Sequence, residues 1–99
     1  MDFKVSFQPL FIEDLERIVR QIARQNPDAA QKLGERIIQT GETLCFFPER
    51  YPRVRQRPDV RRFIVGNYFK VFYRVHYPSR TVQILRCWDG RRAHHPPMS

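Results

Sequence analysis

Three strand-like segments separated by two short turns occupy most of the C-terminal half, and no other feature constrains the fold as strongly. The segments cover residues 60–65, 68–76 and 81–88, with turns at residues 66–67 and 77–80. Short turns that contain glycine, asparagine or proline between strand-forming runs are typical of β-hairpins. The sequence therefore predicts an antiparallel meander of three strands.

Residues 3–7 and 9–25 show two different hydrophobic periods. Phe3, Val5 and Phe7 alternate with polar residues, which is the pattern of a half-buried strand. From residue 9 onward the apolar positions follow the helical period: Phe11, Leu15, Ile18, Val19 and Ile22. These periods predict a strand over residues 3–7 and an amphipathic helix over about 9–25.

A second helix is predicted over about residues 27–46. Asn26-Pro27 provides an N-cap and a proline at the first helical position. The apolar positions of this helix are Ala30, Leu33, Ile37, Ile38 and Leu44. We expect it to form an antiparallel hairpin with the first helix and to end at Phe46-Phe47-Pro48.

The predicted fold class is α+β with the element order βααβββ. Residues 48–59 contain three prolines and four arginines, so a basic connecting loop without helix or ladder pairing is expected there. Residues 93–99 resemble a frayed tail. Because 99 residues with 41% apolar content suffice for one core, we expect a single domain, 1–99, with the helical hairpin packed on a small, mainly antiparallel twisted sheet.

Positive charge is concentrated in the second half of the chain. Residues 1–49 carry six Lys/Arg and eight Asp/Glu, whereas residues 50–99 carry twelve Lys/Arg and two Asp/Glu. The formal net charge of +8 therefore belongs to the second half. Such asymmetry indicates an anionic partner, which is either a nucleic acid or an acidic protein segment.

The chain lacks the motifs of common cofactor and metal enzymes. No GxGxxG, phosphate loop, HExxH or serine-nucleophile motif is present, so neither a cofactor nor a metal is expected. Cys45 and Cys87 have no metal-site spacing and are expected to be reduced thiols, although their redox state stays open. No apolar run reaches the roughly 20 residues of a membrane helix, and no signal peptide is visible. A cytoplasmic protein without a membrane segment is expected.

The last two strands combine core positions with basic ones. In the strand over 68–76, the face expected in the core carries Phe69, Val71, Tyr73 and Val75, and the other face carries Lys70, Phe72, Arg74 and His76. In the strand over 81–88, Arg86 interrupts a face that is otherwise apolar. An arginine in that position needs a partner or lies at a ligand-facing edge.

The element order and several motifs together resemble the RelE/ParE superfamily of bacterial toxin–antitoxin toxins. The motifs are the helical DLERIVRQIARQNPDAAQKLGERI, the pair Arg61-Arg62, the strand FYRV and the closing ILRCWDGRR. The resemblance covers nearly the whole chain. It implies a small basic toxin that is held inactive by a cognate antitoxin with an acidic, partly disordered C-terminal segment.

The resemblance leaves the mechanism open between two branches. ParE-like members poison DNA gyrase, and the long helical hairpin with the FYRV…ILRCWDGRR ending looks more like this branch, although Asp89 stands where ParE-type chains more often have histidine. RelE-like members are ribosome-dependent mRNA endonucleases that use basic residues on the sheet. The expected function is a ParE-like gyrase inhibitor; the alternatives are the mRNA endonuclease and a nontoxic basic binding module.

The candidate site residues differ between these functions. For target binding they are Arg74, Trp88, Arg91 and Arg92. For the nuclease alternative they are Arg61, Arg74, Arg86, His94 and His95, where a histidine would transfer the proton. For antitoxin binding they are Val5, Phe11, Leu15 and Ile18. Alternation alone also predicts a solvated polar face for the strand arginines.

Overall fold

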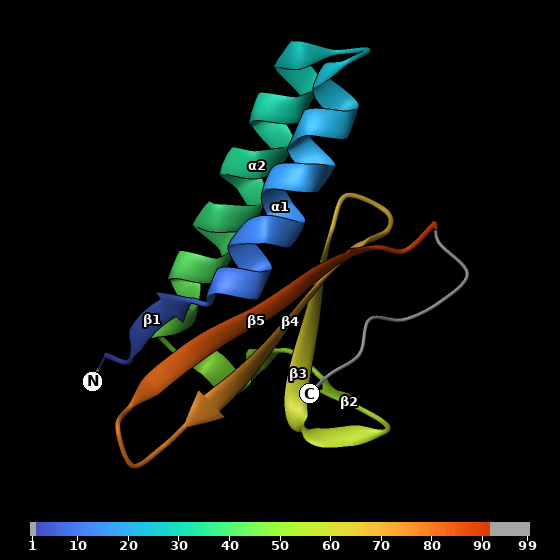
Figure 1. The fold of residues 1–99 in the computed structure, drawn as a ribbon. Coiled ribbons are helices and arrows are strands. Elements are labelled where there is room, and N and C mark those ends of the chain that lie inside the picture. The colour runs from blue at the N-terminus through green and yellow to red at the C-terminus, as the bar shows by residue number, and fades with distance from the viewer. Residues whose placement is uncertain (1, 92–99) are drawn as a thin grey trace.

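The computed structural model describes residues 2–91, which form a helical hairpin and a five-stranded sheet (Figure 1). The elements are β1 Lys4–Phe7, α1 Pro9–Ala23, α2 Pro27–Glu42, the 3₁₀ helices η1 Thr43–Cys45 and η2 Pro48–Arg50, β2 Arg53–Val54, β3 Arg57–Val65, β4 Phe69–His76 and β5 Thr81–Asp89. The predicted α+β class and the helical hairpin are confirmed. None of the helices within residues 2–91 is long and apolar enough to cross a bilayer.

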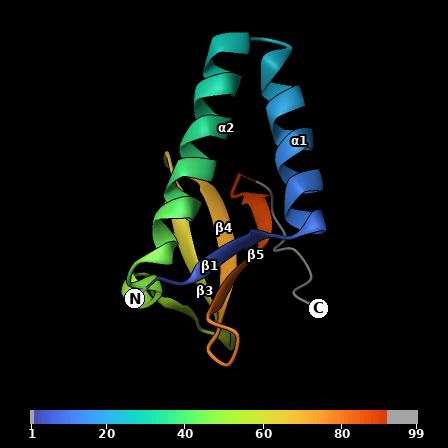
Figure 2. The same cartoon turned by 90° about the vertical axis from the view of Figure 1, so that its left-hand side faces the viewer.

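The strand order in the sheet is β1-β5-β4-β3-β2. The meander of β3, β4 and β5 is antiparallel, as predicted. Within residues 2–91, the first strand, β1, pairs in parallel with the last, β5, so that Val5 lies opposite Val82. The hairpin packs through its lower part on this sheet, and the α1–α2 turn lies away from it (Figures 1 and 2).

The segment 48–59 is more structured than predicted. It contains η2 and β2, and β3 already begins at Arg57. Ladder pairing is possible despite the prolines because Pro52 contributes its carbonyl, which accepts the Arg62 N–H at 3.1 Å, and because Pro58 precedes the part of β3 that pairs with β4. The second helix is also shorter than predicted, since α2 ends at Glu42 and η1 follows.

The core lies between the hairpin and one face of the sheet. Its buried side chains are Phe11, Ile18, Ile37, Leu44, Phe63, Val65, Phe69, Val71, Tyr73, Val82, Ile84 and Cys87. The expected core face of β4 is therefore largely confirmed, with Val75 half-buried at its end. Phe72 differs from the expectation, because it is buried although it alternates with the core positions.

A β-bulge between β4 and β5 explains why simple alternation fails in the last strand. Phe72 pairs with Arg86 and Tyr73 pairs with Ile84, so Leu85 is an additional residue without a counterpart. The bulge places both Ile84 and Cys87 in the core. The prediction that Arg86 shares a face with Ile84 is therefore wrong, because the extra residue reverses the alternation at this point.

Candidate functional site

Arg86 forms a buried ion pair that connects the first helix to the last strand. Its Nε donates to Asp14 Oδ2 at 2.7 Å, and its Nη2 donates to Asp14 Oδ1 at 3.1 Å. The same carboxylate accepts the backbone N–H of Cys87 at 3.1 Å and Arg17 Nη2 at 2.8 Å. Asp14 is only 2% exposed, and its hydrogen bonds raise the pKa of Arg86 above its usual value. Arg86 therefore has the partner that its position requires.

Asp14 was not among the residues selected from the sequence, although a signal was present. It lies three residues after Phe11 and four before Ile18, which places a carboxylate within the apolar stripe of α1. A charge on a core-facing stripe needs a charged partner. Arg86 is the oppositely charged residue in the sheet that likewise stands among apolar positions.

Three arginines line one cavity of about 300 Å³, which we call the arginine cavity. Its lining residues are Gln8, Pro9, Leu10, Arg57, Arg74, Leu85 and Arg86. Two of the nuclease candidates, Arg74 and Arg86, meet here. The described wall contains cations, amides and apolar side chains but no histidine, tyrosine or carboxylate. The cavity is thus suited to binding an anion, and its wall supplies no group of the kind that usually transfers a proton near neutral pH.

The positive charge of the arginine cavity is partly compensated by a neighbouring carboxylate. Arg57 Nε donates to Asp59 Oδ1 at 3.2 Å, and Arg74 Nη1 lies 3.8 Å from Asp59 Oδ2. The hydrogen bond from Arg57 is the main cause that lowers the pKa of Asp59. Arg74 also donates from Nε and Nη2 to the Gln83 amide oxygen, at 3.1 and 3.0 Å. These contacts orient Arg74 before any ligand binds.

Arg61, the third strand arginine among the nuclease candidates, is not part of the arginine cavity. Its Nη1 donates to the carbonyl oxygens of Glu49 at 3.1 Å and Tyr51 at 2.7 Å. Arg61 thus holds the segment between η2 and β2 against β3. This contact supports a structural role for Arg61.

A turn at the end of β5 orients Arg91. Asp89 accepts the backbone N–H of Arg91 at 3.0 Å and its Nη2 at 2.6 Å, and the guanidinium carbon lies 4.7 Å from the centroid of the Tyr68 ring. The Asp89 hydrogen bonds raise the pKa of Arg91. Gly90 is required, because a Cβ there would lie 2.5 Å from the Tyr68 carbonyl oxygen. Arg91 is exposed but held in one geometry.

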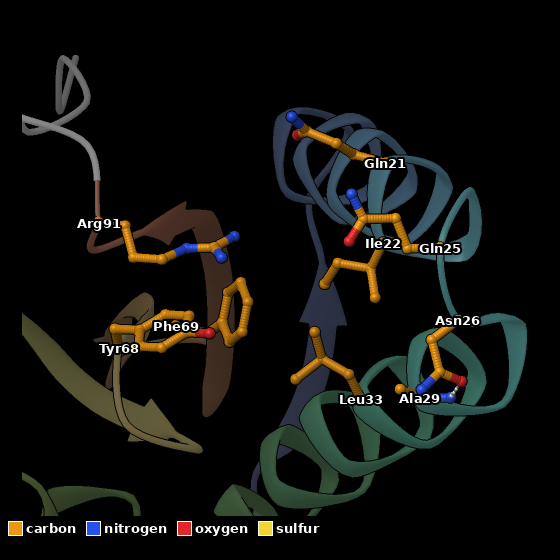
Figure 3. A pocket seen from close by; sticks show the side chains of 9 residues that line it. All are labelled: Gln21, Ile22, Gln25, Asn26, Ala29, Leu33, Tyr68, Phe69 and Arg91. Atoms are coloured by element: carbon orange, nitrogen blue, oxygen red, sulfur yellow. Dashed lines mark hydrogen bonds between the residues drawn. The ribbon is translucent and has the colours of Figure 1, made fainter.

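Arg91 borders a cleft of about 420 Å³ between the distal half of the helical hairpin and the β3–β4 turn (Figure 3). The lining side chains are Gln21, Ile22, Gln25, Asn26, Ala29, Leu33, Tyr68, Phe69 and Arg91. Ile22 and Leu33 point from the two helices toward Phe69, and Gln21 lies across the cleft from Arg91 (Figure 3). This hairpin–sheet cleft combines an apolar floor with polar groups at its rim, which is typical of a protein-binding or ligand-binding site.

The other candidates for target binding lie in different parts of the molecule. Trp88 is half-buried beside Arg17 and Gln21 of α1, so only part of its side chain is accessible to a partner. Arg74 lines the arginine cavity and Arg91 lines the hairpin–sheet cleft, so the structure does not bring these two into one cavity. Arg92, His94 and His95 lie outside the described residues.

The candidates for antitoxin binding divide into core and surface residues. Phe11 is fully buried and Ile18 is 8% exposed, so both side chains belong to the core and not to an accessible seam. Val5 and Leu15 are half-buried. Leu15 borders a shallow groove of about 460 Å³ between the helices, the hairpin groove, whose other lining residues are Gly34, Glu35, Ile38, Gln39 and Glu42.

Comparisons with known proteins give a consistent picture. A family model described as "ParE toxin of type II toxin-antitoxin system, parDE" matches residues 5–94. The fold is similar to a chromosomal ParDE system from P. aeruginosa (21% identity, TM-score 0.75, covering 88% of this chain and 95% of that chain). It is also similar to the toxin–antitoxin complex RelBE2 from Mycobacterium tuberculosis (20% identity, TM-score 0.63, covering 90% of this chain and 99% of that chain). A third similar structure is a mutant of the E. coli toxin RelE in the free state (11% identity, TM-score 0.66, covering 90% of this chain and 84% of that chain). No curated protein sequence matches significantly.

The family match covers most of the chain, and the structural likenesses agree with it in fold. The neighbours below 25% identity support the architecture of hairpin and mixed sheet. The chain therefore belongs to the ParE toxin family of the type II toxin–antitoxin systems.

Proposed function

We propose that this protein acts by binding DNA gyrase and inhibiting it, and that a cognate antitoxin neutralises it. One observation carries the choice of binding over cleavage. The arginine cavity supplies three guanidinium groups, and the described residues of its wall include no proton-transfer group. Such a surface binds and orients an acidic partner well, but general acid–base catalysis needs a further group.

The principal contact with the target is Arg91 at the rim of the hairpin–sheet cleft. Its position is fixed by Asp89, by Tyr68 and by the close approach of Gly90 to the backbone. A side chain that is already ordered loses little conformational entropy when it binds. Arg74 provides a second contact on the arginine cavity, and Arg92 adjoins Arg91 in sequence. Trp88 contributes through its accessible part.

The proposed antitoxin surface is the hairpin groove. Leu15 and Ile38 offer apolar contacts there, while Phe11 and Ile18 are left out because they are buried. A helix of the antitoxin with apolar residues at helical spacing fits such a groove. Because Glu35 and Glu42 lie at its rim, the acidic groups of the antitoxin are expected to point away from this groove and toward the arginine-rich surfaces.

A mRNA endonuclease remains the second candidate, and the convergence of Arg57, Arg74 and Arg86 in one cavity favours it. Guanidinium groups that line one cavity are suitable for phosphate binding. This function would require a proton-transfer group from outside the described wall. The two functions make opposite predictions about gyrase and about messenger RNA.

The experiment that tests the proposal is a DNA supercoiling assay with purified gyrase. The wild-type protein should inhibit supercoiling, and Arg91→Ala should reduce inhibition by roughly tenfold or more, as expected for an interface anchor. Arg24→Ala, which removes an exposed arginine of the same charge near the hairpin turn, is the matched control. Full supercoiling at saturating toxin, together with cut mRNA on translating ribosomes, would refute the gyrase proposal in favour of the nuclease.

A further inference from the structure

The hairpin–sheet cleft combines an apolar interior with one cationic group at its rim. Ile22 and Leu33 point into it from the two helices, and Arg91 is the one charged side chain among its described lining residues (Figure 3). We propose that the cleft accepts an apolar side chain of the target together with a carboxylate beside it, as in a leucine next to a glutamate. This inference rests on the proposed function, which makes Arg91 the principal contact with the target.

The interior of the cleft offers apolar surface that the core leaves accessible. Ile22, Leu33 and Tyr68 pack against the core but are only half-buried. The accessible part of these side chains gains favourable contacts when an apolar group of a partner covers it. The volume of about 420 Å³ lies in the lower part of the range of ligand sites, which suits one or two side chains and not a whole helix.

Arg91 retains hydrogen-bond donors for a carboxylate. Its Nε donates to Asp89 Oδ1 at 2.9 Å and its Nη2 donates to Asp89 Oδ2 at 2.6 Å, whereas Nη1 has no acceptor within residues 2–91. Figure 3 shows the guanidinium directed from the sheet toward the helices. Asp89 therefore orients the guanidinium and leaves one of its nitrogens for a second acceptor. Because Asp89 also balances the charge of Arg91, the preference for a carboxylate is expected to be modest.

The cation and the apolar surface are close enough for neighbouring residues of one peptide. The guanidinium carbon of Arg91 lies 4.7 Å from the centroid of the Tyr68 ring and 5.8 Å from that of Phe69. Consecutive Cα atoms of a peptide are about 3.8 Å apart, so a carboxylate on one residue can reach Arg91 while the next side chain enters the cleft. The amides of Gln21 and Gln25 line the cleft and can bond to the peptide backbone.

The aromatic rings of the cleft favour a protein segment over a nucleic acid. Single-stranded nucleic acids bind where bases can stack on exposed rings. Arg91 lies over the Tyr68 ring, whose centroid is 4.7 Å from that of Phe69, and Phe69 itself is only 6% exposed. These contacts leave little ring surface for a base.

Ala29 allows the charge of the cleft wall to be changed without disturbing the fold. It is exposed, lines the cleft and is the third residue of α2. A glutamate in the first turn of a helix is favoured by the helix dipole, so Ala29→Glu should fold. The new carboxylate should repel the carboxylate of the proposed ligand. Ala29→Gln has nearly the same size without the charge and is the matched control.

The first test titrates a capped leucine–glutamate dipeptide into the protein, compares it with the capped leucine–glutamine dipeptide, and reads amide chemical shifts. At millimolar concentration the acidic dipeptide should shift the amides of residues 22, 33, 68, 69 and 91 and bind at least about fivefold more tightly than the neutral one at low salt. Arg91→Gln and Ala29→Glu should abolish this preference, and Ala29→Gln should keep it. No binding at these amides, equal binding of the two dipeptides, or tighter binding of a thymidine trinucleotide there would overturn the proposal.

The second test applies the Ala29 variants to the supercoiling assay. Ala29→Glu should inhibit gyrase at least about fivefold less than Ala29→Gln, because the added carboxylate repels the acidic group of the target. If the wild-type protein inhibits gyrase and the two variants inhibit it equally, the proposed function stands and this inference is overturned. If the wild-type protein does not inhibit gyrase, the proposed function fails, and the dipeptide titration alone decides whether the cleft accepts an acidic and apolar segment.

Discussion

Replacement of Asp14 by asparagine tests how the hairpin is attached to the sheet. The carboxylate accepts two hydrogen bonds from Arg86, one from the Cys87 backbone and one from Arg17. An asparagine side chain is nearly isosteric but keeps only one acceptor oxygen, so its NH₂ group must face a donor in either orientation. The substitution also removes the carboxylate charge that contacts the Arg86 guanidinium.

The expected cost follows from the burial of the pair. Removal of one member of a buried ion pair costs about 3–5 kcal/mol. The Arg86 side chain is 16% exposed and can reach some water, so the lower end of that range, about 3 kcal/mol, is expected. For a domain of about this size, 1 kcal/mol corresponds to a Tm change of about 4–8 °C, so the Tm should fall by about 12–24 °C.

Thermal and urea unfolding, followed by circular dichroism, measure this effect. Glu16→Gln, which removes an exposed carboxylate from the same helix, is the control and should stay within about 0.5 kcal/mol of the wild type. The double variant Asp14→Leu/Arg86→Met removes both charges of the pair, and its remaining cost should be that of the buried Cys87 N–H, which loses its acceptor, about 1–3 kcal/mol. If Asp14→Asn unfolds like the control, the ion pair does not hold the hairpin and the reasoning is wrong.

Three further predictions concern other parts of the molecule. Burial raises the pKa of Cys87 to about 12, so a thiol reagent at pH 8 should label Cys45 and spare Cys87 in the native protein, as read by mass spectrometry; equal labelling would contradict the burial. The hydrogen bond from the Tyr77 hydroxyl lowers the pKa of Glu49 below its ordinary 4.5. The stabilisation from this bond is therefore complete above pH 4.5 and is lost as the pH falls through the folded-state pKa, so Tyr77→Phe should be less stable than the wild type near neutral pH and equally stable in acid. A difference in stability that does not change with pH would argue against the bond. Gly90→Ala should lower the Tm and weaken gyrase inhibition, because the new Cβ meets a backbone oxygen; an unchanged variant would show that the turn adapts freely.

Much of the fold follows from hydrophobic period alone. The helical spacing of Phe11, Leu15 and Ile18 predicts α1, and the alternation in residues 68–76 predicts β4, because both patterns need only local geometry. The position of Asn26 before Pro27 also predicts the start of α2, where the Asn26 side chain accepts the Ala29 N–H at 3.1 Å.

The features that could not be predicted depend on contacts between distant residues. The bulge at Leu85 arises from the register between two strands, and the partner of Arg86 is 72 residues away in sequence. The parallel pairing of β1 with β5 joins the two ends of the described chain. Local periodicity contains no information on such registers, so the faces of β5 and the roles of Arg61 and Arg86 required the structure.

For the candidate site residues too, the local sequence pattern explains part of the outcome and the tertiary structure explains the rest. Arg91 follows Gly90 at the end of a strand, and the structure shows why a glycine stands there, because Gly90 lies close to the Tyr68 carbonyl oxygen. Phe11 and Ile18 were selected from an apolar stripe, but a stripe has a centre that is buried and edges that are accessible. Leu15 lies at such an edge, which explains why it borders the hairpin groove.

Direct binding measured with two competing targets tests the central claim. Labelled wild-type protein is mixed with equal amounts of purified gyrase and translating ribosomes, and the complexes are separated by sedimentation. The account predicts that the label sediments with gyrase, that Arg91→Ala releases it, and that higher salt weakens the complex because a basic surface contributes to association. Label that sediments with ribosomes, with gyrase free of toxin, would contradict the claim.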